Sequence, residues 1–598
     1  MNMKKMIAFL CAFSLLLLPC TAFAEEEMKL EVADNYAAIY EESAGAKVTM
    51  LHSFIEQADS VEKREVPLYL FKAESERNID LYYLNGIGDI PFIDVRDLTA
   101  LMNAFALAYE EPAISYTASC AGPIFTLCRE NNTFVMFDFY GQTITFTDMP
   151  RFSMRSAIAN PLDFVLMSAE QEEAQLFNHE EVFYSSGSVK TLSMKEYGIP
   201  MLLQDGAGYL PLQTVSDLLL TPWGVAAMCS GQSVVAANAE LLLQPEMSEL
   251  YYTGETGKKS PELTAFAYNE LCMTLDVFYG LRDEHQITDF DSYFIRTGLV
   301  NKLYTDDPAT MADGLADLCI MHLCDGHSAL DLSSYLLEVD LLDIIGAYFA
   351  GPQLNRIINQ SNYYMARMNY YPEGVPGYEE IGNTAYITFD QFACDMERDY
   401  YAQEPENNPQ DVPELLMYAN RQIRREGSPI RNVVLDLSVN AGGLVNAAIA
   451  AASWYLGVFN MSVYETATGA SAINAYGFDA NADHTVDVDS DSLAKGYNLF
   501  CLISPNSFSC GNLVPAAFRE SGKVTLLGHR SGGGACQVHT ISTADGFMLR
   551  ISGNYRLSTM NNGIYYSVDE GVNPDIVITD LDHLYNREYL TEYINSLP

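Results

Sequence analysis

Hydrophobic and polar residues alternate in three successive patterns along this chain. From 25 to 245, short apolar runs alternate with polar residues as in strands, and 133–139 and 143–147 flank a Tyr-Gly-Gln turn as a hairpin would. From 260 to 370 the apolar spacing becomes three to four residues, which predicts helices. From 377 to 598, short β runs alternate with helical stretches. This order predicts right-handed crossovers and a mostly parallel sheet.

The β-α order of the last segment can be followed element by element. Strands are expected at 385–389, 433–437, 499–504 and 523–527, helices at 412–425 and 444–456, and hairpin-like strands at 537–542, 547–552 and 555–558. We therefore predict an α/β chain made of strand-rich α+β N-terminal modules (25–245), a helical cap subdomain (260–370) and a β-α core (377–598).

One short pattern occurs twice in the N-terminal segment. Pro91–Leu98 and Pro211–Leu218 both fit Pro-apolar-x-x-Val-x-Asp-Leu, which predicts a short strand that turns into a helix. The two copies stand too far apart for a solenoid. They resemble the small β-α modules found as N-terminal appendages on bacterial secreted proteins.

The first 24 residues have the composition of an export signal. Lys4 and Lys5 precede an apolar stretch from Met6 to Leu18, and Ala22-Phe23-Ala24 forms a small-x-small cleavage site. We expect a mature chain that begins at Glu25 and is secreted or held at the extracytoplasmic cell surface. No later window has the roughly 18 uninterrupted apolar residues of a membrane span, so no transmembrane segment is expected.

Charge and cysteine content limit the classes of partner. A net charge of −46, with acidic residues spread along the chain, repels phosphate backbones, so nucleic acid is not an expected partner. Ten cysteines follow the signal segment; Cys120 with Cys128 and Cys510 with Cys536 are suggestive couples, although sequence does not fix disulfide connectivity. There is no CxxC, and His179-Glu180-Glu181 lacks the second histidine of a metalloprotease helix. We predict no metal site and no cofactor.

Two turns carry the candidate chemistry. Ser507–Asn512 follows the apolar strand 499–504 and opens a helical stretch that stops at Gly522. A serine at such a junction is held on a tight turn with its hydroxyl exposed, as a nucleophile requires. Asp436–Gly443 ends another buried strand in a glycine turn, where backbone N–H groups can approach a substrate carbonyl as in an oxyanion hole. Each turn by itself is also compatible with an ordinary β-α connection.

Together these motifs carry a family resemblance. In chain order they are 385–389, 436–443, 507–512, 527–534 and 571–576. The region from about 377 to 577 resembles the S41 peptidase family of C-terminal processing proteases, tricorn protease and the interphotoreceptor retinoid-binding modules. The resemblance implies the ClpP/crotonase-like β-α core of that family.

The resemblance also implies roles for residues at the two turns. The family nucleophile is the serine three residues before an acidic or amide residue, which selects Ser509 here. Ser507 is the alternative, with turn hydrogen bonding as its expected role. The N–H group of Cys510 would supply one oxyanion donor, and that of Gly442 or Gly443 the other.

The proton acceptor departs from one branch of the family and fits another. The processing branch uses a lysine where this chain has Gly534, and Lys523 lies on the wrong side of the neighbouring strand. The tricorn-like branch takes a histidine from an N-terminal helical subdomain, and 323–328 matches that motif. His327 is therefore the candidate general base. His322, on an apolar helix face, is expected to be structural.

A third, acidic member of the site is expected just before Gly571. Glu570 and Asp569 are the residues available there, and Glu570 is slightly preferred. Either carboxylate is also compatible with a solvated loop charge.

The implied function is a serine peptidase that hydrolyses peptide bonds of proteins or peptides by acyl transfer, as an endopeptidase or a trimmer of carboxyl ends. An α/β-hydrolase is disfavoured because that fold needs its acid and then its histidine after the serine; His529 and His539 come too early, and His583 lies in a charged tail. The remaining alternative is a catalytically inactive S41-fold protein that binds a ligand or peptide. No PDZ-like loop is found, so substrate selection would fall to the N-terminal modules or the cap.

Overall fold

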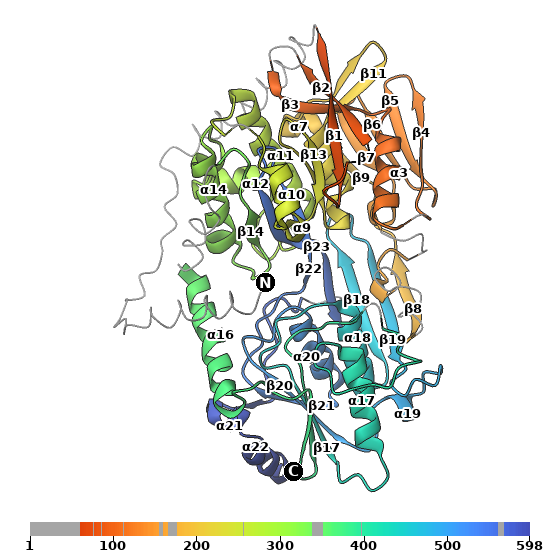
Figure 1. Ribbon diagram of the computed structural model, residues 1–598, viewed down its shortest axis with the longest axis vertical. Coiled ribbons are helices and arrows are strands. Elements are labelled where there is room, and N and C mark those ends of the chain that lie inside the picture. Colours follow the sequence, from red (N-terminus) through yellow and green to blue (C-terminus); the bar gives the residue numbers. More distant parts are fainter. Residues whose placement is uncertain are drawn as a thin grey trace, which may run out of the picture.

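The computed structural model describes residues 60–75, 77–84, 87–111, 113–154, 160–165, 176–254, 256–337, 351–395, 398–559 and 567–597. The predicted signal segment lies outside these residues. The chain forms an elongated molecule in which the N-terminal sheets and the cap helices up to residue 317 occupy one half and the C-terminal β-α core the other, while the last predicted cap segment, 351–370, runs alongside the core (Figure 1).

A seven-stranded sheet forms the base of the N-terminal half. Its order is β10-β11-β3-β2-β1-β13-β12. The strands are β1 (Val61–Leu70), β2 (Arg77–Leu84), β3 (Ile87–Asp94), β10 (Leu202–Gln204), β11 (Ala207–Pro211), β12 (Ala226–Cys229) and β13 (Val234–Ala237). The two copies of the sequence repeat are neighbours in this sheet: β3 leads into α3 (Leu98–Ala108), β11 leads into α8 (Leu212–Leu219), and the two strands pair antiparallel with Pro211 opposite Phe92. The predicted strand-to-helix reading of both copies is confirmed.

A five-stranded antiparallel sheet packs beside it, in the order β4-β5-β6-β7-β9. The strands are β4 (Tyr116–Ala121), β5 (Ile124–Arg129), β6 (Phe134–Asp138), β7 (Thr143–Phe146) and β9 (Lys190–Ser193). The predicted hairpin is β6 with β7. Cys120 faces Phe125 across β4 and β5 while Cys128 faces Thr117, and all ten cysteines among the described residues are free thiols, so neither suggested couple is bonded.

The cap is helical, as the periodicity predicted. Its elements are α11 (Pro261–Phe278), α12 (Phe290–Thr297), α13 (Val300–Leu303), α14 (Pro308–Asp317), the π-helical turn η2 (Leu318–Leu323) and α16 (Gly351–Tyr370). Helix α11 begins where Ser260 caps it, accepting the N–H of Leu263 at 3.0 Å, with Pro261 in its first turn. Leu271, Leu275 and Phe278 are all buried. Shorter helices in the first half of the chain are α4 (Met149–Ser153), α7 (Met194–Tyr197), η1 (Thr221–Trp223), α9 (Ala239–Leu242) and α10 (Pro245–Tyr251).

A third sheet, of six strands, joins the two halves. Its order is β14-β23-β18-β19-β8, with β22 paired to β23. The strands are β8 (Phe177–Ser185), β14 (Ala329–Leu332), β18 (Phe459–Glu465), β19 (Ser471–Phe478), β22 (Cys536–Ser542) and β23 (Met548–Thr559). They come from the N-terminal modules, the cap and the core, so the three predicted segments share this sheet. The prediction of separate strands at 547–552 and 555–558 is wrong, because β23 continues through Gly553, whose missing side chain leaves room for His539.

The C-terminal sheet is the mostly parallel one that the sequence predicted. Its order is β15-β16-β17-β20-β21-β24, and only β15 runs antiparallel to its neighbour. The strands are β15 (Tyr378–Ile381), β16 (Thr384–Thr388), β17 (Asn432–Asp436), β20 (Asn498–Ile503), β21 (Val524–Gly528) and β24 (Ile576–Val577). Both faces are covered, because Val433 and Leu435 of β17 enter one hydrophobic core and Val434 enters another.

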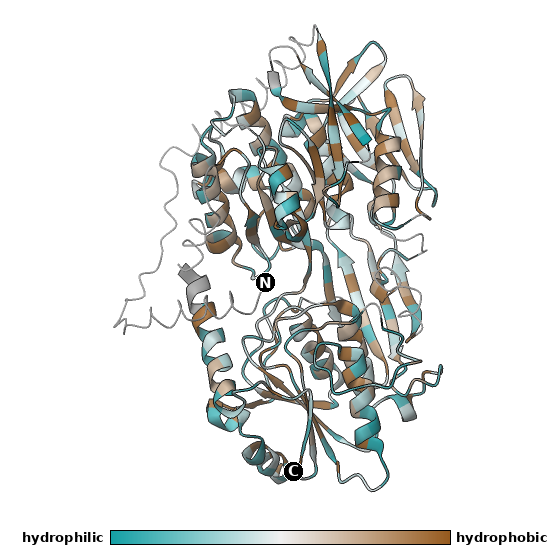
Figure 2. Ribbon diagram, in the orientation of Figure 1, coloured by the Kyte–Doolittle hydropathy of each residue, from teal (hydrophilic) through white to brown (hydrophobic). Residues whose placement is uncertain are grey.

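Helices supply the two covers of this sheet. Helices α17 (Val412–Arg424), α18 (Val445–Leu456) and α20 (Cys510–Ser521) pack in the first core, and α16, α21 (Leu581–Tyr585) and α22 (Arg587–Ser596) pack in the second; α19 (Val488–Asp491) is a surface turn. Figure 2 shows apolar residues along the sheet strands and polar residues on the outer turns of α17. This arrangement brings the ends of β17, β20 and β21 together at one edge, where the candidate site lies.

Candidate active site

Ser509 lies at the junction between β20 and α20, as predicted. Its backbone has φ +57° and ψ −122°, a conformation that L-residues rarely adopt and that is held by a hydrogen bond from its N–H to the carbonyl of Gly533 at 2.8 Å. Ser507 is fully buried; its hydroxyl donates to the carbonyl of Leu437 at 2.7 Å and accepts the N–H of Ser504 at 3.0 Å. The turn therefore consumes the hydroxyl of Ser507 and leaves that of Ser509 available.

The glycine turn after β17 packs directly on Ser509. A Cβ atom on Gly442 would lie 2.7 Å from the Cβ of Ser509, and Gly442 and Gly443 have φ angles of +106° and +135°. The N–H of Gly442 is occupied, because it donates to the Oδ1 of Asn440 at 2.9 Å. Within the described part of the chain, the N–H groups of Gly443 and Cys510 donate no hydrogen bond. Of the two glycines that the sequence left open as oxyanion donors, Gly443 is the one with an available N–H.

A pocket of about 360 Å³ opens beside Ser509. Its lining is predominantly apolar and comes from the glycine turn, α18, α20, β22 and β23, with one residue from the N-terminal modules. The lining residues are Phe164, Gly443, Leu444, Val445, Asn446, Ser509, Cys510, Leu513, Gly534, Ala535, Cys536, Gln537, Val538 and Leu557. The pocket contains no lysine, and Lys523 donates instead to the carbonyl of Leu456, so the structure offers no serine-lysine pair.

Asn512 ties the nucleophile helix to the loop before β24. Its side chain is fully buried; Nδ2 donates to the carbonyl of Val568 at 2.8 Å and Oδ1 accepts the hydroxyl of Ser531 at 2.7 Å. The same hydroxyl accepts the N–H of Val572 at 2.6 Å. The amide that identifies the serine motif therefore has a structural role in holding two turns together.

His327 is brought to the same edge by the loop after η2. The chain turns at Cys324 and Gly326, both with positive φ, and the carboxylate of Asp325 accepts the N–H groups of His327 and Ser328 at 3.0 and 2.7 Å. The second oxygen of Asp325 accepts the hydroxyl of Tyr279 at 3.0 Å. These bonds hold the loop in place. Asp325 is therefore a functional candidate, although the sequence indicated it only as part of the motif at 323–328.

The imidazole of His327 lies against the residue that precedes the nucleophile. Its ring centroid is 4.6 Å from that of Phe508, its Nδ1 is 3.4 Å from the hydroxyl of Ser552, and only 8% of the residue is exposed. His327 and Ser509 form no hydrogen bond with each other. Burial lowers the pKa of His327 to about 4, although the nearby Asp325 carboxylate favours the charged form. The imidazole is therefore neutral, and able to accept a proton, at neutral pH.

The two candidate acids differ in their surroundings. Glu570 is exposed over 87% of its side chain and pairs with Arg530 at 3.1 Å. Asp569 is half-buried, accepts the N–H of Ala535 at 2.8 Å, and burial raises its pKa to about 6. Neither carboxylate makes a hydrogen bond or ion pair with His327. Asp569 is therefore the more buried of the two carboxylates, and neither is placed as a direct partner of the imidazole.

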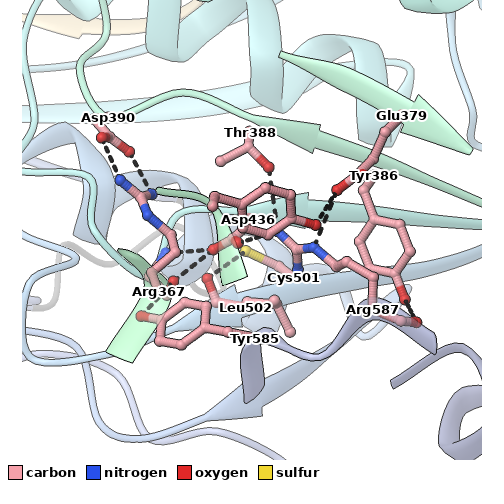
Figure 3. Close-up of polar contacts among 12 residues, drawn as sticks. Arg367, Glu379, Tyr386, Thr388, Asp390, Asp436, Cys501, Leu502, Tyr585 and Arg587 are labelled. Carbon is pink, nitrogen blue, oxygen red and sulfur yellow. Dashed lines mark hydrogen bonds and ion pairs between the residues drawn. The ribbon is translucent and has the colours of Figure 1, made fainter. Parts of the chain in front are cut away.

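A buried charge network supports the start of the glycine turn (Figure 3). Asp436, the last residue of β17, accepts the N–H and hydroxyl of Ser438 and pairs with Arg587 of α22. Burial by itself would raise the pKa of Asp436, but the charges of Arg587 and Arg367 hold it below its ordinary value. Arg367 is in turn paired with both oxygens of Asp390. The C-terminal helix therefore fixes the base of the glycine turn, a role that no sequence motif indicated.

The comparison with family models identifies this arrangement. Residues 383–578 match the model of Peptidase family S41. These residues are an S41 peptidase domain. The match covers every turn described above except the His327 loop, and it supports the assignment of the chain as a peptidase, a hydrolase of peptide bonds. Among the described residues, no helix combines the length and the apolar character needed to cross a membrane.

The chain is also similar to solved structures at low identity. A putative peptidase from Parabacteroides merdae is 18% identical over 56% of this chain and 96% of its own, with a TM-score of 0.39. The photosystem II D1 C-terminal processing protease is 18% identical over 34% of this chain and 46% of its own, with a TM-score of 0.25. A lipoprotein from Streptococcus agalactiae is 14% identical over 55% and 96%, with a TM-score of 0.33. No curated protein matches the chain.

Proposed function

We propose that this chain is a serine peptidase that hydrolyses peptide bonds by acyl transfer. The Oγ of Ser509 attacks the scissile carbonyl carbon, and the N–H groups of Cys510 and Gly443 stabilise the oxyanion that forms. The observation that carries the proposal is the strained Ser509 backbone beside two backbone donors that have no other partner. A residue held in a rare backbone conformation, next to backbone N–H groups that lack partners, is typical of a catalytic centre.

The apolar pocket gives the substrate its place. An apolar side chain seated in this pocket of about 360 Å³ beside Ser509 would fix the carbonyl next to the hydroxyl. Leu513 and Val538 line this space, and Phe164 closes it from the N-terminal modules. Substrates should therefore carry an apolar residue next to the bond that is cleaved.

His327 is the proposed general base. As Ser509 attacks, the imidazole takes the hydroxyl proton, and it then gives that proton to the leaving amine. In the second half of the reaction a water molecule attacks the acyl carbon and His327 takes its proton. His327 then returns that proton to the Oγ of Ser509 as the acyl group leaves. Because His327 bonds to Ser552 rather than to Ser509 in this structure, its side chain has to rotate across the ring of Phe508 when substrate binds. Asp325 keeps the backbone of the loop fixed during that rotation.

We also propose that the protein acts outside the cytoplasm, on proteins or peptides. The export-type segment at residues 1–24 supports this location. The activity is that of an endopeptidase or of a trimmer of carboxyl ends, the two forms that the family resemblance implies.

Labelling with a fluorophosphonate probe tests the assignment. The intact protein should be labelled, Ser509→Ala should abolish labelling, and Ser507→Ala should keep it, because the hydroxyl of Ser507 is bonded within the turn. His327→Ala should slow labelling and peptide cleavage by about 10²–10⁴-fold. A folded wild-type protein that takes no label would contradict the proposal and favour a peptide-binding protein with an inactive S41 fold.

A further inference from the structure

Arg356 lies beside the nucleophile turn, although no motif marked it. It belongs to the first turns of α16, and its Cζ lies 4.3 Å from the ring centroid of Phe508. A Cβ atom on Gly326 would be 2.0 Å from its Nη1, so the guanidinium packs flat on the backbone of the His327 loop. The guanidinium and the His327 imidazole thus contact the same Phe508 ring, which directly precedes Ser509.

Among the residues that the structure describes, none accepts a hydrogen bond from Arg356. It makes no hydrogen bond or ion pair with any residue that the structure describes. Arg367, three turns along the same helix, is paired with both oxygens of Asp390, and Arg587 is paired with Asp436. A half-buried guanidinium has five N–H groups to satisfy, in a fork that matches a carboxylate. The guanidinium of Arg356 has donors that no described residue uses, so a ligand from outside can satisfy them.

The nearby carboxylates do not fill this role. Asp325 is engaged with Tyr279, Ser328 and the N–H of His327, and Asp569 accepts the N–H of Ala535. Both lie close enough to favour the charged form of Arg356, but burial still lowers the pKa of Arg356. A cation held in a partly desolvated site, without a bonded counter-ion, is a binding site for an anion from outside.

We propose that Arg356 binds a carboxylate of the peptide substrate close to the scissile bond. The inference rests on the proposed peptidase function and adds a substrate class to it. Arg356 is not among the residues that line the 360 Å³ pocket, so the apolar side chain and the carboxylate occupy different places beside Ser509. The carboxylate is either the free α-carboxylate at the peptide end, which would make the enzyme a trimmer of carboxyl ends, or an acidic side chain.

Binding to the inactive Ser509→Ala variant tests this without requiring turnover. Three fluorescein-labelled hexapeptides of alanine with one leucine serve as probes: one ends in a carboxylate, one in a carboxamide, and one in a glutamate whose α-carboxyl is amidated. Fluorescence anisotropy should give a Kd at least about 30-fold lower for one carboxylate peptide than for the neutral amide, as expected for a bidentate charged hydrogen bond. Adding Arg356→Gln should remove that difference and leave the Kd of the amide within about threefold.

Arg296→Gln is the matched control. Arg296 also lies over an aromatic ring, but that ring belongs to Tyr293 of α12 and not to Phe508. This variant should keep the full carboxylate preference. Arg356→Lys should keep part of the preference, because it retains the charge and loses the fork.

The outcomes separate a binding role from a packing role. Preference for the terminal carboxylate or for the glutamate peptide supports the proposal and identifies the source. Equal Kd values for all three peptides overturn it, as does an Arg356→Gln variant that weakens the carboxylate and amide peptides equally, since Arg356 would then only position Phe508. Failure of the peptidase function is seen separately, as absent fluorophosphonate labelling of Ser509 in the otherwise unchanged protein.

Discussion

Gly442 offers a direct test of how closely the glycine turn controls the nucleophile. In Gly442→Ala the new Cβ would lie 2.7 Å from the Cβ and 3.2 Å from the Oγ of Ser509. Gly374 has a similar φ, +101° against +106°, but a Cβ there would have no atom within 4 Å. The two alanine variants therefore share the same backbone strain and differ in the contact with Ser509.

The expected magnitudes follow from these distances. Each variant should lose about 1–3 kcal/mol of stability from the left-handed backbone. Carbon atoms pack at about 3.5–4.0 Å, so in Gly442→Ala the side chain of Ser509 or the turn has to move by close to 1 Å. A displacement of that size costs about 10²-fold in rate when it misplaces a reacting group. Gly442→Ala should therefore reduce kcat/KM about 100-fold relative to Gly374→Ala.

The assay is cleavage of a fluorogenic peptide that carries leucine before the scissile bond, together with the Tm of both variants. Comparable Tm values with a large difference in kcat/KM are expected. If Gly442→Ala kept kcat/KM within about threefold of Gly374→Ala, the reasoning that the turn sets the position of the nucleophile would be refuted.

Three further predictions concern charge. Because burial lowers the pKa of His327 to about 4, kcat/KM should stay level from pH 8 to about 5, and an acid limb with a pKa near 6.5 would contradict this assignment. Arg587→Met leaves the buried Asp436 without its ion-pair partner, so unfolding by denaturant should show a loss of about 3–5 kcal/mol, partly recovered by Asp436→Leu in the same chain. Burial raises the pKa of Asp217 to about 7; its stabilising protonated form is complete below pH 3.8 and is lost as pH rises through 7. Asp217→Asn should therefore flatten the decline of Tm between about pH 4 and 7, and an unchanged slope would contradict the raised pKa.

The C-terminal fold was predictable because its signals are local. In runs such as Val433–Leu437 and in the helices beside them, the spacing of apolar residues along the sequence predicts which positions are buried. The parallel strand order follows from the alternation of strands and helices. The serine and glycine turns were equally visible, since a nucleophile junction and an oxyanion turn need particular residues at short spacing. The strands β18 and β19 were not foreseen, and their pairing with β8 joins segments that carry no common pattern.

The sequence by itself determined the S41 core, the order of its motifs and the identity of Ser509 as the candidate nucleophile. Only the tertiary structure decided that Gly443 rather than Gly442 has an open N–H, that Ser507 is consumed within its turn, and that Arg356 and His327 share the ring of Phe508. The contacts of Ser507, Arg356 and His327 join residues far apart in the chain, whereas Gly442 bonds to Asn440 within its own turn. Such contacts are set by how the layers pack, and a single sequence holds no periodicity that records them.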